Sequence, residues 1–234
     1  MYDSMKDFET IIFDLDGTLI DSAPICREIL DRMSTTRGGP SISLLQVRPF
    51  VSIGGAEMIK KVLGSYSLDP KNDINEFREY YASLPTPPES LFPSVLETIS
   101  WLMAQGFTLG ICSNKPQRLC DKVLEDTKLS KYFSTVIGGD ILPRSKPDAG
   151  HLLETIARIN GNIEKTLYVG DSETDYKTSK NASVPFLFAS YGYGNEYEIP
   201  PTVPRLKSIS FLPEFVQSGT LSNRLINHKL LKGG

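Results

Sequence analysis

Short apolar runs alternate with amphipathic stretches along most of the chain, and this alternation predicts its fold. The first run, Ile11-Ile12-Phe13, has the length and composition of a buried strand. Further strand-like runs follow at residues 107–112, 135–137, 166–169 and 185–189. Apolar residues at helical spacing predict helices between them, near residues 95–103, 116–123 and 152–159. Strands that alternate with helices in this way predict an α/β core, a doubly wound and mostly parallel Rossmann-like sheet.

The segment between residues 20 and 90 breaks this rhythm. It shows helical patterns without clear strands, carried by Ile25, Ile29 and Met33, by Met58, Ile59 and Val62, and by Ile74, Phe77, Tyr81 and Leu84. A stiff connector, Pro85-Thr86-Pro87-Pro88, follows it. We therefore expect a core domain of residues 1–20 and 91–216, with a small all-helical cap domain of residues 21–90 inserted after the first strand. Residues 217–234 are expected to form a C-terminal tail, in which a short docked helix over 221–231 is an option.

Composition narrows the class of protein. The 234 residues include 40% hydrophobic and 23% charged residues, which is enough apolar material for a sizeable core. A net charge of -3, with no dense stripe of Lys and Arg, argues against nucleic-acid binding. No apolar run reaches membrane-spanning length, and the polar start, residues 1–9, does not read as a signal peptide. These features predict a cytoplasmic protein that does not bind a membrane.

Cysteine and histidine are scarce. Cys26, Cys112 and Cys120 form no CxxC pair, so they are expected to be reduced thiols, buried or partly buried. The two histidines, His151 and His228, are too few to support histidine-ligated zinc or Ser-His-Asp chemistry, and each is expected to be solvated. Any acid/base chemistry therefore falls to carboxylates.

Two carboxylates follow the first strand-like run. Asp14 and Asp16 are two residues apart, so they project to the same side of an extended chain. Gly17 permits a sharp turn, and Thr18 adds a hydroxyl beside the pair. Crowded carboxylates repel each other unless a cation or a shared proton lies between them. The pair therefore predicts a metal site, an acid/base pair, or both.

Polar residues also follow two other predicted strands. Ser113 and Asn114 come after the run at 107–112, and Asp171 comes after the run at 166–169. Ligands of doubly wound sheets bind beyond the carboxyl ends of the strands, where these residues would lie. Pro116 suits the first turn of the next helix, whose start would offer backbone N–H groups to an anion.

Taken in order, these segments resemble the four motifs of the haloacid dehalogenase-like hydrolase superfamily. The motifs are Asp14-Leu15-Asp16-Gly17-Thr18, Ser113-Asn114, Lys146-Pro147 and Gly170-Asp171-Ser172-Glu173-Thr174-Asp175. The helical insert is similar to the cap of the phosphoglycolate phosphatase/β-phosphoglucomutase branch. The segment Ser190-Tyr191-Gly192-Tyr193-Gly194 resembles an aromatic-glycine turn of phosphoglycolate phosphatase-like members. One departure is the polar set Thr178, Ser179 and Ser183, where small Ala and Gly residues are usual.

The resemblance implies a phosphoric monoester hydrolase that forms an aspartyl-phosphate. Asp14 would be the nucleophile, and Asp16 would be the general acid and then the base. Mg²⁺ would be held by Asp14, Asp171 and the backbone carbonyl of Asp16.

The resemblance also implies partners for the transferring phosphoryl group. Ser113 and the Asn114 backbone amide would bind it, and Lys146 would neutralise it, with Lys115 a weaker candidate for that charge. A plain helix-capping serine and an exposed loop lysine are the ordinary alternatives for Ser113 and Lys146.

Around these residues, Thr18, Ser172 and Asp175 would support the site from outside the direct contacts. Asp175 could hold a metal-bound water or orient Lys146, although an aspartate favoured by the first turn of a helix is a serious alternative. Arg48, Lys60 and the Gly54-Gly55 helix start are candidates for contact with the far end of the substrate, against the alternative of a solvated face.

The function expected from this set is a Mg²⁺-dependent phosphatase acting on a small phosphorylated metabolite, such as phosphoglycolate or a sugar phosphate. A sugar phosphomutase of the β-phosphoglucomutase kind remains an alternative, because it would use the same four motifs. A non-catalytic binding module on the same fold is a second alternative. The protein is expected to be a monomer or a homodimer.

Overall fold

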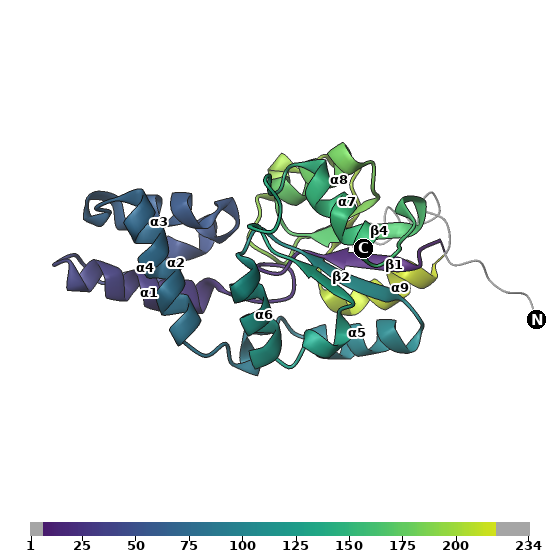
Figure 1. Ribbon diagram of the computed structural model, residues 1–234, viewed down its shortest axis with the longest axis horizontal. Helices are drawn as coiled ribbons and strands as arrows, with labels where there is room; N and C mark the ends of the chain where they lie inside the picture. Colours follow the sequence, from purple (N-terminus) through teal and green to yellow (C-terminus); the bar gives the residue numbers. More distant parts are fainter. Residues whose placement is uncertain (1–6, 219–234) are drawn as a thin grey trace, which may run out of the picture.

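A six-stranded, all-parallel sheet forms the centre of the protein, which a computed structural model describes over residues 7–218 (Figure 1). The strand order is β3-β2-β1-β4-β5-β6. The strands are β1 (Thr10–Phe13), β2 (Thr108–Cys112), β3 (Thr135–Ile137), β4 (Thr166–Gly170), β5 (Phe186–Ala189) and β6 (Arg205–Leu206). The predicted doubly wound α/β core is confirmed. The two-residue β6 was not predicted, because so short a strand leaves no apolar run to recognise.

Both faces of the sheet are covered by helices. In β1, Ile11 and Phe13 pack into the apolar cluster that also contains buried residues of α5 (Val95–Ala104), α6 (Gln117–Asp126) and α9 (Leu212–Gln217). Ile12, between them, faces the opposite cluster with α7 (Ala149–Arg158) and α8 (Glu173–Ala182). All four residues of β1 are buried. Burial on both faces explains why the strands read as continuous apolar runs.

The other helices lie as a group beyond the carboxyl ends of the strands, at the left of Figure 1. They are α1 (Ala23–Thr36), α2 (Leu44–Val47), α3 (Gly55–Leu63) and α4 (Pro70–Ser83), and α1 contacts each of the other three. Short 3₁₀ segments occur at Arg48–Ile53, Gly64–Tyr66, Pro88–Ser90, Ser130–Tyr132, Ile163–Lys165, Glu196–Glu198 and Ile209–Phe211. The three helical patterns predicted before residue 90 correspond to α1, α3 and α4; α2 is too short to show a helical period.

The chain leaves and re-enters the core at neighbouring points. Ile20 and Leu91 form an antiparallel bridge, and the Asp21 amide donates to the Ser90 carbonyl at 2.7 Å. The Phe92 amide donates to the Leu19 carbonyl at 3.0 Å, on the other side of the bridge. The helical segment is thus attached to the core by two paired chain crossings. This geometry suits the predicted cap over residues 21–90, whose division from the core stays a prediction.

Buried polar residues of α8 find partners on the backbone. The Thr178 hydroxyl donates to the Thr174 carbonyl at 2.7 Å, and the Ser179 hydroxyl donates to the Val184 carbonyl. Ser183 ends the helix as its C-cap in the left-handed conformation. These hydrogen bonds explain how polar residues occupy positions where the resemblance leads one to expect small apolar ones.

Two expectations about isolated residues have different outcomes. Cys26, Cys112 and Cys120 are free and buried, as predicted. The prediction that His151 is solvated is wrong: the residue is fully buried, with Nε2 3.1 Å from the Gly138 carbonyl oxygen. It lies on the side of α7 that packs against the sheet, a side on which the sequence pattern alone did not place it. His228, the helix option at 221–231 and most of the predicted tail lie outside the described residues.

Over residues 7–218, every helix is too short or too polar to cross a membrane.

Helix α5 ends where its sequence predicts. Gly106 follows the C-cap residue, Gln105, and has a φ of 79°. Its N–H donates to the Met103 carbonyl at 2.9 Å, and the Phe107 N–H donates to the Leu102 carbonyl at 3.1 Å. This double hydrogen bond closes the helix and needs a left-handed residue at position 106.

We expect Gly106→Ala to destabilise the protein by about 1–2 kcal/mol, because an L-residue is strained in the left-handed conformation. A Cβ at Gly106 would meet no heavy atom within 4 Å, so the loss isolates the backbone effect. Gly106→Asn should lose less, since asparagine tolerates this conformation. Urea unfolding of the three proteins measures the difference; an Ala variant as stable as the Asn variant would contradict it.

Candidate active site

Polar side chains converge where β1, β2 and β4 end. The strand order places β1 between β2 and β4, so Asp14, Ser113 and Asp171 emerge at one edge of the sheet. A cavity of about 210 Å³ opens there. Its wall combines residues of the core loops with residues of η1 (Arg48–Ile53), α3 and α4. The site therefore lies between the sheet edge and the helical segment.

Lys146 is the cation at the centre of this edge. Its ammonium donates to Asp14 Oδ1 at 2.8 Å, to Asp175 Oδ1 at 2.6 Å and to the Tyr168 hydroxyl at 3.0 Å. These three contacts match the three N–H donors of a lysine side chain. Lys146 is only 6% exposed, so the alternative of an exposed loop lysine is excluded.

The loop that carries Lys146 is held by Asn114. The Lys146 N–H donates to Asn114 Oδ1 at 2.9 Å, and Asn114 Nδ2 donates to the Lys146 carbonyl at 3.1 Å. This pair of hydrogen bonds ties the loop after β3 to the loop after β2. The Asn114 side chain thus fixes the lysine, a role distinct from the phosphate contact predicted for its backbone amide.

Asp175 is occupied by the protein at both oxygens. Oδ1 accepts from Lys146 and from the Tyr168 hydroxyl, the latter at 2.6 Å, while Oδ2 accepts from the Ser172 amide at 3.1 Å and hydroxyl at 2.5 Å. Ser172 and Asp175 form the capping box that begins α8. Asp175 is therefore both a capping residue and an anchor for Lys146.

Tyr168 is a contributor that the sequence reading missed. It lies inside the apolar run of β4, where an aromatic residue is ordinary core material. Burial, with the nearby Asp175 carboxylate adding to it, raises the pKa of its hydroxyl well above the usual value. The neutral phenol can therefore donate to Asp175 while accepting from Lys146.

Asp171 is held by hydrogen bonds from two other segments of the chain. Its Oδ2 accepts from the Tyr193 amide at 2.8 Å and from the Ser52 hydroxyl at 3.0 Å. Ser52 belongs to η1, so the helical segment reaches across to the core at this point. Asp171 Oδ1 is buried and has no hydrogen-bond partner among the described residues.

The turn after β5 packs closely on Asp171. A Cβ at Gly192 would lie 2.4 Å from the Asp171 Cβ, and one at Gly194 would lie 1.8 Å from the Asp171 carbonyl oxygen. Tyr191 donates its hydroxyl to the Thr18 carbonyl at 2.7 Å. The aromatic-glycine turn noted in the sequence therefore braces both Asp171 and the chain after Asp16.

Asp16 and Thr18 complete the loop after β1. Lys115 donates to both oxygens of Asp16, each at 3.0 Å, so each carboxylate oxygen of Asp16 has a partner within the protein. The Thr18 hydroxyl is buried and has no partner among the described residues. Gly17, with a φ of 84°, lets the loop pass so close to Asp171 that a Cβ would meet its Oδ2 at 2.2 Å.

Comparison with known proteins fits this arrangement of four loops. The sequence profile of the family described as Haloacid dehalogenase-like hydrolase matches residues 11–189. The chain belongs to the haloacid dehalogenase-like hydrolase family. This match spans both the sheet core and the helical segment.

The similarity to individual relatives agrees with this family assignment. The chain is 34% identical to a phosphoglycolate phosphatase of Rhodobacter capsulatus over 219 residues, covering 91% of this chain and 98% of the relative. It is 34% identical to phosphoglycolate phosphatase 1 of Pseudomonas aeruginosa, covering 84% of this chain and 74% of the relative. The predicted family and the predicted enzyme class, a phosphoric monoester hydrolase, are confirmed.

Solved structures support the fold. A predicted phosphoglycolate phosphatase from Haemophilus somnus superposes with a TM-score of 0.79 at 24% identity, over 92% of this chain and all of the other. A β-phosphoglucomutase from Clostridium difficile superposes with a TM-score of 0.70 at 17% identity, over 95% of this chain and 99% of the other. At these identities the likeness concerns the fold alone.

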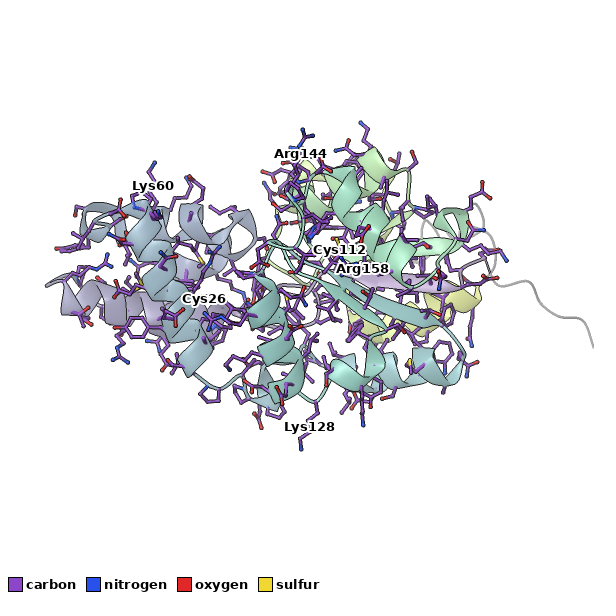
Figure 2. The ribbon with its side chains drawn as sticks, in the orientation of Figure 1. Cys26, Lys60, Cys112, Lys128, Arg144 and Arg158 are labelled. Carbon is purple, nitrogen blue, oxygen red and sulfur yellow. The ribbon has the colours of Figure 1, made fainter. Side chains whose placement is uncertain are left out.

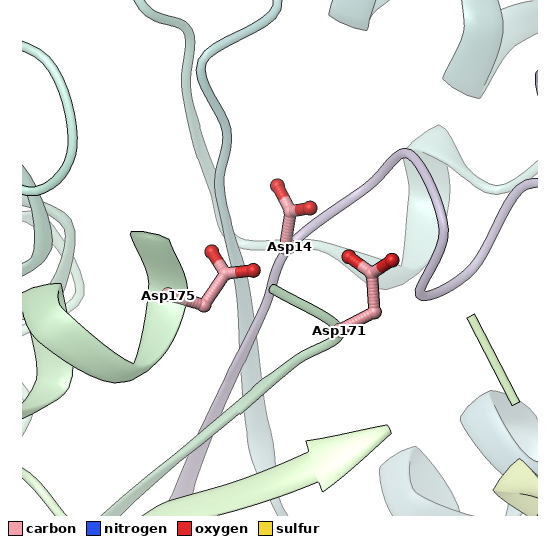
Figure 3. Close-up of side chains that lie close together, drawn as sticks. All are labelled: Asp14, Asp171 and Asp175. Atoms are coloured by element: carbon pink, nitrogen blue, oxygen red, sulfur yellow. The ribbon is translucent and has the colours of Figure 1, made fainter. Parts of the chain in front are cut away.

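Three carboxylates in this family site could hold a cation. Asp14, Asp171 and Asp175 each present an oxygen within 4.8 Å of the others, and their side chains lie close together in Figure 3. Burial raises the pKa of Asp14 to about 6, against the opposing effect of Lys146. Burial and the charges of Asp175 and Asp14 raise the pKa of Asp171 well above its usual value.

Burial is the main cause of both shifts and the neighbouring carboxylates add to it, so a bound cation would favour the charged forms. The unpartnered Asp171 Oδ1 offers it an oxygen ligand, as Mg²⁺ prefers. Asp175 is the least available of the three, because both its oxygens already accept hydrogen bonds. The predicted site thus fits a Mg²⁺ ion through Asp14 and Asp171, and the role of the Asp16 carbonyl stays a prediction.

Neither of the two basic residues predicted to contact the substrate, Arg48 and Lys60, lies in the lining of the cavity. Arg48 lies 3.5 Å from Asp21 Oδ2 and beside the Tyr193 ring, outside the lining of the cavity. Lys60 is exposed on α3 and points away from the core in Figure 2. The sequence pattern around these residues does not show which side of their segment faces the cavity. Gly54 and Gly55 do line the cavity, together with Ser52 and Arg78.

We expect Mg²⁺ to stabilise the wild-type protein by relieving the repulsion between the buried carboxylates. At a hundredfold excess over its Kd, the unfolding temperature should rise by about 5–10 °C. Asp171→Asn should abolish this rise without lowering the unfolding temperature measured in a chelator. Glu154→Gln, at an exposed carboxylate on α7, is the matched control. An Asp171→Asn protein that still responds to Mg²⁺ would remove Asp171 from the site.

Proposed function

We propose that this hydrolase is a Mg²⁺-dependent phosphatase that cleaves a small phosphate monoester through an aspartyl-phosphate on Asp14. The observation that carries the proposal is the Asp14–Lys146 pair on the wall of the cavity, with Asp16 on the same wall. This arrangement offers an attacking carboxylate, a cation for the phosphoryl group and a proton carrier within one small space.

In the first step, Asp14 Oδ2 attacks phosphorus, since Oδ1 is held by Lys146. A bond forms between Oδ2 and phosphorus while the bond from phosphorus to the alcohol oxygen breaks. Asp16 gives a proton to the departing oxygen, so the product leaves as a neutral alcohol. Ser113, which is 2% exposed and lines the cavity, would donate to an oxygen of the transferring phosphoryl group.

In the second step, water attacks the phosphorus of the aspartyl-phosphate. Asp16 takes a proton from the water, and inorganic phosphate leaves as the Asp14 carboxylate is restored. Lys146 holds the carboxylate in place through both steps, because Asp175 and Tyr168 fix its ammonium. Mg²⁺, when bound by Asp14 and Asp171, would offset the negative charge of the nucleophile and the phosphoryl group.

Arg78 supports a substrate that carries a second anionic group. Among the described residues that line the cavity, three are basic: Arg78, Lys115 and Lys146. Lys115 is paired with Asp16, and Lys146 with Asp14 and Asp175, whereas Arg78 has no ion pair within residues 7–218. A guanidinium that faces the same cavity as the nucleophile suits a carboxylate at the far end of the substrate. The names of the relatives point the same way, and phosphoglycolate is the simplest such substrate.

A sugar phosphomutase is the second candidate, because it would use the same Asp14, Asp16 and Lys146. The β-phosphoglucomutase structure shares the fold, but a shared fold does not favour either the phosphatase or the phosphomutase activity. The unpaired Arg78 favours a substrate with a second anion, and a bisphosphate would satisfy it as well as a carboxylate would. A non-catalytic module is disfavoured, since every position of the expected chemistry is filled. Cytoplasmic location and a monomeric or dimeric state stay predictions.

We expect Asp14→Asn to lower phosphate release by at least about 10³-fold, since the amide is no nucleophile. Phosphate release should be measured on a panel of substrates that includes phosphoglycolate, glycerol phosphates and hexose phosphates. Lys131→Met, which changes an exposed lysine, is the control. Undiminished turnover by Asp14→Asn would refute the aspartyl-phosphate route. Isomerisation of a hexose 1-phosphate, activated by a bisphosphate and faster than hydrolysis, would establish the mutase instead.

We expect Arg78→Ala to lower kcat/KM for phosphoglycolate by about 10- to 100-fold, the effect of losing a charge-assisted hydrogen bond. The neutral amide, 2-phosphoglycolamide, should be affected less than about threefold. Lys60→Ala, a basic residue outside the cavity, should change neither value. Equal losses on both substrates would show that Arg78 does not read the carboxylate.

A further inference from the structure

Lys115 is a buried cation whose position the catalytic scheme above leaves unexplained. Its side chain is 7% exposed, and its ammonium lies 3.0 Å from both oxygens of Asp16. The ammonium also lies 3.9 Å from the centroid of the Tyr81 ring. Asp16 belongs to the core, whereas Tyr81 belongs to α4 of the helical segment. One ammonium therefore joins the proton carrier to the segment that covers it.

The backbone of Lys115 is fixed by the core. Its carbonyl accepts from the Gly139 amide at 2.9 Å and from the Cys120 thiol at 3.4 Å, and its amide lies 3.4 Å from Ser113 Oγ. The side chain thus starts from a rigid point between β2 and α6. Its reach to Asp16 is set by this anchoring and does not depend on a flexible surface loop.

The partners of the ammonium come from both sides of the cavity. A buried ammonium is stable only when charge or π-electron density replaces its lost water. Asp16 of the core supplies the negative charge, and the ring of Tyr81, a residue of α4 that is 1% exposed, supplies the π surface. The nearby Cys26 thiol does not compete as an anion, because burial raises its pKa to about 12. If α4 moved away, water would reach Lys115, and the hold on Asp16 would loosen.

We propose that Lys115 is a positioning residue that sets the Asp16 carboxylate for proton transfer only while Tyr81 covers its ammonium. The proposal rests on the proposed role of Asp16 in phosphate ester cleavage.

A double-mutant cycle tests whether Lys115 acts through Asp16. Lys115→Met, which keeps most of the apolar stem, should lower kcat on phosphoglycolate about 10- to 100-fold and change KM less than about threefold. In an Asp16→Asn background the same substitution should have no further effect, because the group it positions is gone. Equal losses in both backgrounds would overturn the proposal.

The leaving group provides a readout that a merely structural role would not move. The alcohol of an alkyl phosphate needs a proton as it departs, whereas 4-nitrophenolate departs without one. Under single-turnover conditions, Lys115→Met should therefore slow release of the alcohol more than release of 4-nitrophenolate. The same fold loss on both substrates would show a general disturbance and contradict the proposal.

Tyr81 tests the link to α4. Tyr81→Phe keeps the ring, and its kcat should stay within about twofold of the wild-type value. Tyr81→Leu removes the ring and should lower kcat roughly tenfold. Tyr81→Leu combined with Lys115→Met should be no worse than Lys115→Met alone. Tyr80→Leu, on the same helix but packed against Arg32, is the matched control. Additive losses would show that Tyr81 does not act through Lys115.

Folding and function are separated by two further measurements. Lys115→Arg keeps the charge and should retain more activity than Lys115→Met, and circular dichroism with thermal unfolding checks that each variant is folded. If Lys115→Met does not fold, the Arg variant and the Tyr81 series still decide the matter by the same criteria. If the wild-type protein is inactive on every phosphate ester, the proposed function is wrong. If the wild-type protein is active but the effects of the paired substitutions on kcat simply add, only this inference is wrong.

Discussion

The contact of the Lys146 ammonium with Asp14 and Asp175 is the interaction on which the rest of the site depends. Carboxylates buried this close together would take up protons or disrupt the fold without a cation among them. Three separate loops must therefore meet with little freedom: the loop after β1 brings Asp14, the loop after β3 brings Lys146, and the start of α8 brings Asp175. The Asn114 side chain locks the second of these to the loop after β2. The central place of β1 in the sheet is what allows all of them to reach one point.

The sequence revealed the fold and the chemical groups better than their partners. The strands β1 to β5 were predictable because strands buried on both faces have continuous apolar sequences. Asp14, Asp16 and Asp171 were predictable as candidate site residues because they follow such apolar runs. The burial of Lys146, the phenol of Tyr168 and the pairing of Lys115 with Asp16 were not, since each depends on segments far apart along the chain. Arg48 and Lys60 lie outside the cavity lining and Arg78 lies within it, because tertiary packing decides which side of a helix faces the cavity.

The core and the helical segment divide the work of recognition. The residues expected to touch the phosphoryl group, Asp14, Ser113 and Lys146, all come from loops at the sheet edge. Much of the rest of the cavity wall comes from η1, α3 and α4, which supply apolar residues such as Val51, Ile74 and Phe77. Core residues outside that group, among them Lys115, Pro116 and Leu119, also line the cavity. The lining residues between positions 51 and 81 belong to a stretch that is attached to the core by two paired chain crossings.

The turn after β5 has a consequence for attempts to redesign this enzyme. Gly192 and Gly194 press against Asp171 so closely that no larger side chain fits without displacing it. Although the turn looks like a surface loop that could be varied, its backbone packs directly against Asp171. A library for new substrate preference should therefore leave residues 190–194 untouched and draw its diversity from the opposite wall. A loop insertion at this turn would displace Asp171, one of the three carboxylates that could hold a cation.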